Sequence, residues 1–319
     1  MSDLPDLTGR VASISGATSG LGYATALWLL RKGAKVYIGA RNESKAVAVL
    51  GKLEREGLGP GNGTPIYHKL DLANPKDAKE SAEEFLKREE RLDILVNNAA
   101  LLAKPFELGP LGIQDIVIVN HISPFLFTSI LLPLLKKTAL LPDADVRIVN
   151  VSSYGHNFAV NVKFEEKEDF NGPNRENGPK DNVNRYGYTK LMNILWTKEL
   201  SRRLKVSVDD GSSRIMCLSL HPGTVATEGI TKWLMSFIWP VNYLLNAAYY
   251  LFSYTTDKAS GTILIAAAAP NVRSERSEYD GAYLIPIGKI GKVSKDASDE
   301  KKQADLWNLT ERILFDEIL

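Results

Sequence analysis

The glycine-rich stretch 15–22 constrains the fold of this chain more than any other part of its sequence. It follows a short apolar run at 11–14 and leads into the mostly apolar segment 23–30, which is typical of a helix with a buried face. A strand, a glycine-rich turn and a helix in this order present free backbone N–H groups to a phosphate. The same pattern also fits a helix that simply begins at Thr18 or Ser19 as N-cap, so phosphate binding needs support from the rest of the chain.

Strand-like runs alternate with helical segments over the remaining sequence. The predicted strands cover residues 11–14, 35–39, 66–70, 94–96, 146–151, 214–220 and 282–285. The predicted helices cover 23–30, 44–56, 75–90, 113–135 with interruptions at Pro124 and Pro133, and 186–204, and an exposed polar loop covers 163–185. Strands that are apolar throughout and separated by helices form parallel sheets covered on both faces. We therefore expect an α/β fold with a Rossmann-type doubly wound sheet of about seven strands, in a single domain over 1–319.

Composition narrows the classes of protein and partner. Apolar residues make up 44% of the 319 residues and charged residues 24%, as in a globular domain. Lysine and arginine together number 39 and aspartate and glutamate 38, so we expect no nucleic-acid partner. No group of His, Cys, Asp and Glu has the spacing of metal ligands, so no metal is expected. The single cysteine, Cys217, lies in an apolar run and the N-terminus lacks a secretion signal, which predicts a cytoplasmic protein with a buried thiol.

The ends of the predicted strands point to a ligand site. Ligands of doubly wound sheets bind at the carboxyl ends of the strands. Small, polar or charged residues occupy those ends here: Gly16, Arg41, Asp71, Asn98, Ser153, Pro222 and Gly223. Such an edge is what a nucleotide crevice requires.

The ordered motifs of the chain resemble those of the short-chain dehydrogenase/reductase family: the glycine turn, Asn-Asn-Ala at 97–99, Ser153, Tyr-x-x-x-Lys at 186–190 and Pro-Gly at 222–223. The similarity spans residues 8–290. The long segment between Ser153 and Tyr186, and the tail after residue 285, resemble the retinol-dehydrogenase-like and WW-domain-oxidoreductase-like branch. Two positions depart from the family pattern, since Ser15 replaces a threonine and Ala100 replaces a glycine, but neither change removes a reacting group.

The resemblance implies a catalytic group of Asn120, Ser153, Tyr186 and Lys190, in which Asn120 holds a water for a proton relay. It also implies a cofactor site lined by residues of the glycine turn and the strand ends: Gly16, Thr18, Ser19, Gly20, Leu21, Gly22, Arg41, Asp71, Leu72, Asn98, Ala99, Tyr186, Lys190, Pro222, Gly223, Val225 and Thr227.

Physical chemistry explains why Tyr186 and Lys190 suit hydride transfer. Four residues apart, they share one face of a helix. A phenol titrates at about 10 and is a poor acid or base at neutral pH, but a nearby ammonium lowers its pKa. Tyr186 would exchange a proton with a carbonyl or alcohol oxygen, while Ser153 would hydrogen-bond the same oxygen. Lys190 would also hold the hydroxyls of the nicotinamide ribose.

Each of these assignments has a plainer alternative. A tyrosine and a lysine four apart are common on helix surfaces, and a serine after a strand can simply cap a turn. Ser152 competes with Ser153, and Tyr188 competes with Tyr186, although only Tyr186 stands four residues before a lysine. Asn120 also fits a solvated helix position. We interpret His121 and His221 as structural.

The end of the second predicted strand indicates which nucleotide binds. A carboxylate there would bind the adenosine 2′-hydroxyl and repel a 2′-phosphate. Residues 39–42 hold no acid, and the guanidinium of Arg41 suits a phosphate, although a solvent-facing arginine fits as well. We therefore predict NADP(H) as the cofactor, with Asp71 and Leu72 lining the adenine pocket.

The segment 233–256 has no charged residue and is long enough to span a bilayer. Pro240, Asn242 and Asn246 argue against a transmembrane helix, and in the family the region after Gly223 forms a lid over the substrate. We expect a substrate lid at 224–258, with peripheral membrane contact through 233–256 and a membrane span as the alternatives. The lid and the interfacial interpretation both imply a lipophilic substrate.

The leading hypothesis is an NADP(H)-dependent oxidoreductase that acts on a lipophilic carbonyl/alcohol pair with Tyr186 as acid and base. The alternatives are a catalytically silent NADP-binding sensor or scaffold and a membrane-surface retinoid or lipid dehydrogenase. The helical tail at 299–319 fits either packing on the core or a partner interface, and a homo-oligomer stays open.

Overall fold

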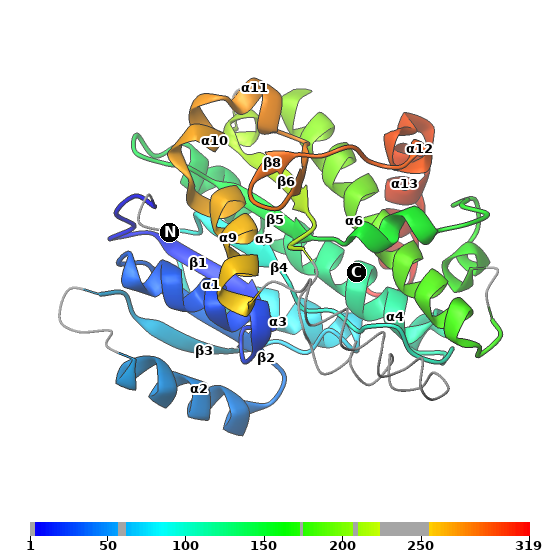
Figure 1. Cartoon of the computed structure of the whole chain (residues 1–319), viewed down its shortest axis with the longest axis horizontal. Coiled ribbons are helices and arrows are strands. Elements are labelled where there is room, and N and C mark those ends of the chain that lie inside the picture. Colours follow the sequence, from blue (N-terminus) through cyan, green and yellow to red (C-terminus); the bar gives the residue numbers. More distant parts are fainter. Residues whose placement is uncertain (1–3, 57–61, 173–174, 207–209, 224–254) are drawn as a thin grey trace.

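The computed structural model describes residues 4–56, 62–172, 175–206, 210–223 and 255–319 (Figure 1). A single sheet runs through the molecule in the strand order β3-β2-β1-β4-β5-β6-β7-β8. Its strands are β1 Val11–Ser15, β2 Lys35–Ala40, β3 Pro65–Lys69, β4 Ile94–Asn97, β5 Arg147–Val151, β6 Met216–Leu220, β7 Tyr283–Ile285 and β8 Lys289–Ile290. The strands β1 to β7 pair in parallel, which confirms the doubly wound Rossmann-type fold.

The described sheet has eight strands, one more than the seven that the sequence marks. The eighth strand, β8, pairs antiparallel with β7 at the edge of the sheet, with Leu284 opposite Ile290. Both residues of β8 are exposed, so neither a buried apolar run nor an alternating pattern marks this strand in the sequence.

Helices cover both faces of the sheet (Figure 1). The longer ones are α1 Gly20–Arg31, α2 Glu43–Arg55, α3 Pro75–Arg88, α5 Ser123–Ala139, α6 Pro179–Val206, α9 Thr256–Ala268 and α13 Glu300–Glu317. The short ones are α4 Asp115–Val117, α10 Pro270–Ser274, α11 Arg276–Tyr279, α12 Lys295–Ser298, the π-turn η2 Ile118–Ile122, and the 3₁₀ turns η1 Pro110–Gly112, η3 Tyr154–Phe158, η4 Lys167–Asn171 and η5 Ser212–Arg214. One core cluster joins α1 and α9 to the sheet, and the other joins α3, α5, α6 and α13 to it.

Two helix predictions need correction. The first is α6, which begins at Pro179 instead of residue 186. Proline is well tolerated in the first turn of a helix. The asparagines and charged residues that follow Pro179 are typical of a loop, so the sequence did not indicate a helix there. The second is the helical stretch Asp115–Ala139, which continues past both predicted interruptions. Pro124 falls in the first turn of α5, after the π-turn, and Pro133 is accommodated inside α5. Tyr186 therefore lies well inside a helix.

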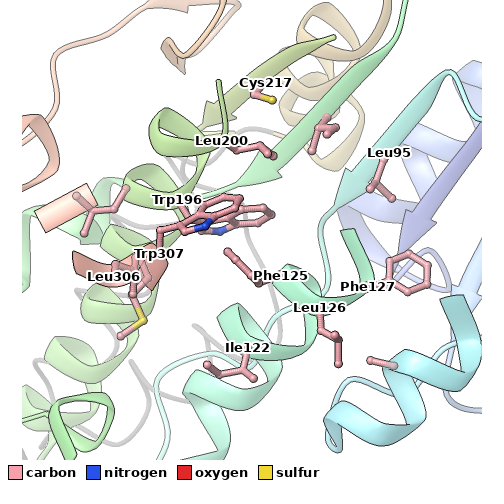
Figure 2. Packing of buried hydrophobic residues seen from close by; sticks show 14 of the residues in the cluster. Leu95, Ile122, Phe125, Leu126, Phe127, Trp196, Leu200, Cys217, Leu306 and Trp307 are labelled. Carbon is pink, nitrogen blue, oxygen red and sulfur yellow. The ribbon is translucent and has the colours of Figure 1, made fainter. Parts of the chain in front are cut away.

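The C-terminal tail packs on the core. Trp307 of α13 contacts Phe125 of α5 with ring centroids 4.7 Å apart, and Phe125 contacts Trp196 of α6 at 5.7 Å (Figure 2). His121 lies 2.9 Å from the Thr310 hydroxyl, which ties the π-turn to the tail. The apolar residues of the tail are buried, namely Leu306, Trp307, Leu309, Ile313 and Leu314. Of the two uses expected for 299–319, the structure shows core packing.

One described helix passes a simple test for a membrane span. The stretch Asp115–Ala139 is long and apolar enough, but 72% of its apolar window is buried inside the molecule. That burial is the behaviour of a core helix in a globular protein, so this stretch is weak support for a membrane span. The segment 233–254, on which the membrane alternative depended, lies outside the described residues.

Candidate active site

The turn between β1 and α1 has the backbone that the glycine pattern predicts. Gly16 and Gly20 adopt left-handed conformations, with φ of +68° and +54°. A methyl group at Gly22 would lie 2.4 Å from the Gly16 carbonyl oxygen, so only glycine allows the helix to approach the turn this closely. Ser19 is the N-cap of α1 and makes no side-chain capping bond. The first N–H groups of α1 are therefore not capped by that side chain, and the turn fits a phosphate.

Ser15 and Asn98 fasten this turn to the neighbouring strand β4. The Ser15 hydroxyl oxygen accepts hydrogen bonds from the backbone N–H groups of Asn98 and Ala99, both at 3.0 Å. The Asn98 side chain donates in return to the Ser15 carbonyl at 2.9 Å. Ser15, which replaces the threonine of the family pattern, therefore positions the segment after β4 through its hydroxyl group.

A cavity of about 1210 Å³ extends along the carboxyl ends of the strands. The predicted cofactor residues that line it are Gly16, Thr18, Ser19, Leu21, Arg41, Asp71, Leu72, Asn98, Ala99, Tyr186, Lys190, Pro222 and Gly223. Gly20 and Gly22 shape the turn without lining the cavity. Val225 and Thr227 lie outside the described residues.

Ser153 and Tyr186 converge from two elements on the same part of the cavity. A methyl group built on Gly155 would lie 3.4 Å from the Ser153 hydroxyl oxygen and 3.5 Å from a ring carbon of Tyr186. Helix α6 approaches η3 because position 187 has no side chain, since a methyl group there would lie 2.4 Å from the Gly155 carbonyl oxygen. Gly187 was not predicted, because the need for a glycine at this position comes from the Gly155 carbonyl, which is distant along the chain.

Lys190 lies beneath this pair and is only 2% exposed. Its Nζ donates to the Val151 carbonyl at 2.9 Å and lies 5.5 Å from the centroid of the Tyr186 ring. Burial lowers the pKa of Lys190 to about 7. The protonation state of this lysine is therefore sensitive to any negative charge that enters the cavity.

The competing residues have other partners. Ser152 donates to the Lys190 carbonyl at 2.7 Å and is buried. Tyr188 donates to the carbonyls of Lys163 and Asp169, at 3.0 and 3.1 Å, and burial raises its pKa. These contacts favour Ser153 over Ser152 and Tyr186 over Tyr188.

Asn120 lies in the π-turn η2 and is buried, and it does not belong to the cavity lining found among the described residues. Its side-chain oxygen Oδ1 accepts from the Leu101 N–H at 2.7 Å, and its side-chain Nδ2 donates to the Leu101 carbonyl at 2.9 Å and to the Thr189 hydroxyl at 3.0 Å. The side chain therefore joins the loop after β4 to α6. It is not the solvated position of the plainer alternative.

The two histidines interpreted as structural have different positions. His121 is fully buried in the core, and burial lowers its pKa to about 3. His221 lines the cavity near Tyr154, with ring centroids 6.3 Å apart, and burial lowers its pKa to about 4. Both imidazoles are therefore neutral at pH 7.

At the other end, the cavity is bordered by two cations. Arg41 is exposed and lines the cavity after β2, and Lys45 lines it from the first turns of α2. Asn42 caps α2 by accepting from the Lys45 N–H at 2.9 Å. The Asp71 carboxylate is turned to the Ala73 N–H at 2.9 Å. Sequence reasoning missed Lys45, because a lysine on a charged helix is usually only a solvated residue.

Part of the cavity wall is apolar. It includes Leu101, Leu102, Ala103, Val119, Phe158 and Val183. Lys104 and Asp115 form an ion pair in this wall, and Lys104 also pairs with Glu107 at 2.7 Å. The site therefore combines a phosphate-compatible turn, a tyrosine beside a lysine, and a lining suited to a hydrophobic molecule.

Comparison with known proteins agrees with this geometry. The family model of the short chain dehydrogenases matches residues 10–162. A short-chain dehydrogenase/reductase of Armillaria gallica is 42% identical, over 98% of this chain and 94% of its own length. Retinol dehydrogenase 12 of Mus musculus is 31% identical, over 97% and 87%.

Solved structures show the same fold. A crystal structure from Mycobacterium Paratuberculosis superposes with a TM-score of 0.68 and 26% identity, and covers 98% of this chain and 96% of its own. An NADP complex of RhlG from Pseudomonas aeruginosa superposes with a TM-score of 0.64 and 22% identity, over 90% of this chain and 98% of its own. Taken together with the motifs and the site, these similarities show that the chain belongs to the short-chain dehydrogenase/reductase family of oxidoreductases, in its retinol-dehydrogenase-like branch.

Proposed function

We propose that the protein is an NADP(H)-dependent oxidoreductase that transfers hydride between the nicotinamide and a lipophilic carbonyl or alcohol. The observation that carries the proposal is the meeting of the Ser153 hydroxyl and the Tyr186 ring at one point of the cavity, above the buried Lys190. Bound NADP(H) would supply the hydride or accept it. Residues of the protein would bind the carbonyl or alcohol oxygen and transfer its proton.

Tyr186 is the proposed acid and base. During reduction its hydroxyl donates a proton to the carbonyl oxygen, and during oxidation it takes the proton from the alcohol. The Ser153 hydroxyl donates a hydrogen bond to the same oxygen and stabilises the negative charge that develops there. Lys190 in its ammonium form would stabilise the phenolate through its positive charge, and a dinucleotide in the cavity would favour that form because its phosphates are anionic.

The cations at the far end of the cavity support NADP(H) over NAD(H). Arg41 lines this end, and it has no carboxylate partner among the residues that the structure describes. Lys45 adds a second positive charge in the first turn of α2. A 2′-phosphate would satisfy both cations, whereas a ribose hydroxyl would not.

The apolar wall supports a lipophilic substrate. Apolar residues of the loop 101–103, with Val119, Phe158 and Val183, line the same cavity as Tyr186, and burial of a hydrophobic substrate against them is favourable. We also propose a cytoplasmic location, supported by the single free and buried Cys217, since a reducing compartment needs no disulfide. The alternative is peripheral membrane contact through 233–256. Fractionation separates the two, because a cytoplasmic protein is expected to stay soluble without detergent after a high-salt wash.

The test is a screen of lipophilic aldehydes, ketones and alcohols, followed by nicotinamide absorbance, with NADPH and NADH compared at equal concentration. We expect turnover of at least one hydrophobic carbonyl with a clear preference for NADPH. Nucleotide binding without turnover of any compound would favour a catalytically silent sensor or scaffold. Equal or better use of NADH would overturn the cofactor assignment.

A further inference from the structure

Arg185, immediately before Tyr186 on α6, is only 2% exposed. An arginine is rarely buried to this degree unless its hydrogen-bond donors are satisfied. Its Nη2 donates to the Lys104 carbonyl at 2.9 Å, and its Nη1 donates to the Glu176 carbonyl at 2.7 Å. It also donates to the side chain of Asn182, one turn earlier on the same helix.

These contacts join helix α6 to two segments that lie outside it. Asn177, whose side-chain oxygen lies 3.4 Å from the Arg185 guanidinium, also accepts from the Phe106 N–H at 2.7 Å. The guanidinium therefore links α6, the segment 175–177 and the loop 101–107. A planar fork with five donors can serve such an array, whereas a single ammonium cannot reach all the acceptors at once.

The linked loop forms one part of the cavity wall, residues 101–104. Residues 101–104 all line it, and Leu101 is held at both its N–H and its carbonyl by Asn120. Lys104 is held at its carbonyl by Arg185. The wall is thus fastened to the catalytic machinery at its beginning by Asn120 and at its end by Arg185.

We infer that Arg185 is a positioning residue that fixes the wall 101–104 relative to Tyr186 and thereby sets the preference for substrates with a bulky apolar body. The inference rests on the proposed function, because it concerns the same cavity. A loosened wall would still allow a small carbonyl to reach Tyr186. It would no longer hold a long hydrophobic substrate with its carbonyl against the phenol.

The experiment compares Arg185→Met and Arg185→Lys with wild type, using decanal and propanal as substrates with a long and a short alkyl chain. We expect the ratio of kcat/KM for decanal over propanal to fall about tenfold in Arg185→Met, mainly through KM for decanal, with an intermediate effect in Arg185→Lys. The affinity for NADPH should not change. Arg202→Met is the matched control, because Arg202 lies on the same helix and binds Glu199, which Arg203 also binds.

Amide hydrogen exchange gives a readout that does not depend on activity. We expect faster exchange in the peptide that contains Phe106, whose N–H is held through Asn177, and unchanged exchange in β4. If the wild type reduces neither aldehyde, the proposed function loses support while exchange still tests the positioning role. The inference is overturned if both aldehydes slow equally in the variants, or if exchange around Phe106 stays at the wild-type rate. If Arg185→Met does not fold, the same two criteria apply to Arg185→Lys.

Discussion

At the nucleotide end of the cavity, the turn 16–22 is local, and its shape follows from the left-handed Gly16 and Gly20. At the other end, the wall and the proposed reacting groups come from segments far apart: the loop 101–104, η3 and α6. The first region is specified by short-range sequence, because backbone conformation depends on neighbouring residues. The second exists only once the packing of α6 against η3 and against the loop is complete.

This contrast predicts that a small change at the packing contact damages catalysis while sparing the nucleotide. In Gly187→Ala, the added methyl group would lie 2.4 Å from the Gly155 carbonyl oxygen and would push α6 away from η3. We expect kcat to fall about a hundredfold, because displacement of a reacting group by about 1 Å has an effect of that size. NADPH affinity, measured by fluorescence titration, should fall much less than kcat, because the turn 16–22 is not displaced. Gly51→Ala on α2 is the control, since its methyl group would meet only the end of the Arg55 side chain. Equal loss of nucleotide affinity and kcat in Gly187→Ala would contradict the separation of the two regions.

The nucleotide end should respond in the opposite way. Arg41→Ala should raise KM for NADPH about tenfold to a hundredfold, as expected for loss of a charge-assisted contact to a phosphate. Lys45→Ala should have a smaller effect in the same direction, and neither variant should alter KM for NADH. Lys52→Ala, on the same helix and outside the cavity lining, serves as the control. Unchanged KM for NADPH in Arg41→Ala would remove the main support for the preference.

The smallest expected effect concerns stability, away from both ends of the cavity. Thr310 donates its hydroxyl to the Leu306 carbonyl at 2.7 Å, so His121 donates from Nε2 to the Thr310 oxygen, and its buried Nδ1 has no partner among the described residues. Burial lowers the pKa of His121 to about 3, from an unfolded value of 6.5. Because the unfolded chain binds this proton more readily, His121 makes the free energy of unfolding fall as pH decreases from 6.5 towards 3, by up to about 1.4 kcal/mol per pH unit.

Urea unfolding between pH 7 and pH 5 checks this expectation. In His121→Gln the free energy of unfolding should depend less steeply on pH than in wild type, although the variant is expected to be less stable at pH 7. His68, whose pKa burial lowers to about 4, keeps part of the pH dependence in both proteins. Identical slopes in wild type and His121→Gln would show that His121 does not contribute.

Much of the nucleotide end could be predicted from the sequence, and much less of the substrate end. The glycine turn, Arg41 and the strands β1 to β7 follow from local patterns. Lys45 was missed because only the position of α2 beside the cavity distinguishes it from a surface lysine. Gly187 and Arg185 were missed for a related reason, since their partners are carbonyls of other segments. Every residue type has the same backbone carbonyl, so no pattern of residue types in the sequence marks such contacts.

The central claim is that the Tyr186 hydroxyl exchanges the proton when hydride moves. The most direct measurement is the single-turnover rate of NADPH oxidation in Tyr186→Phe, with a carbonyl that the wild type reduces and with nucleotide binding measured in parallel. We expect little change in NADPH affinity and a rate at least about a hundredfold lower, as for loss of a general acid. A variant that binds NADPH normally and reduces the carbonyl at the wild-type rate would contradict it.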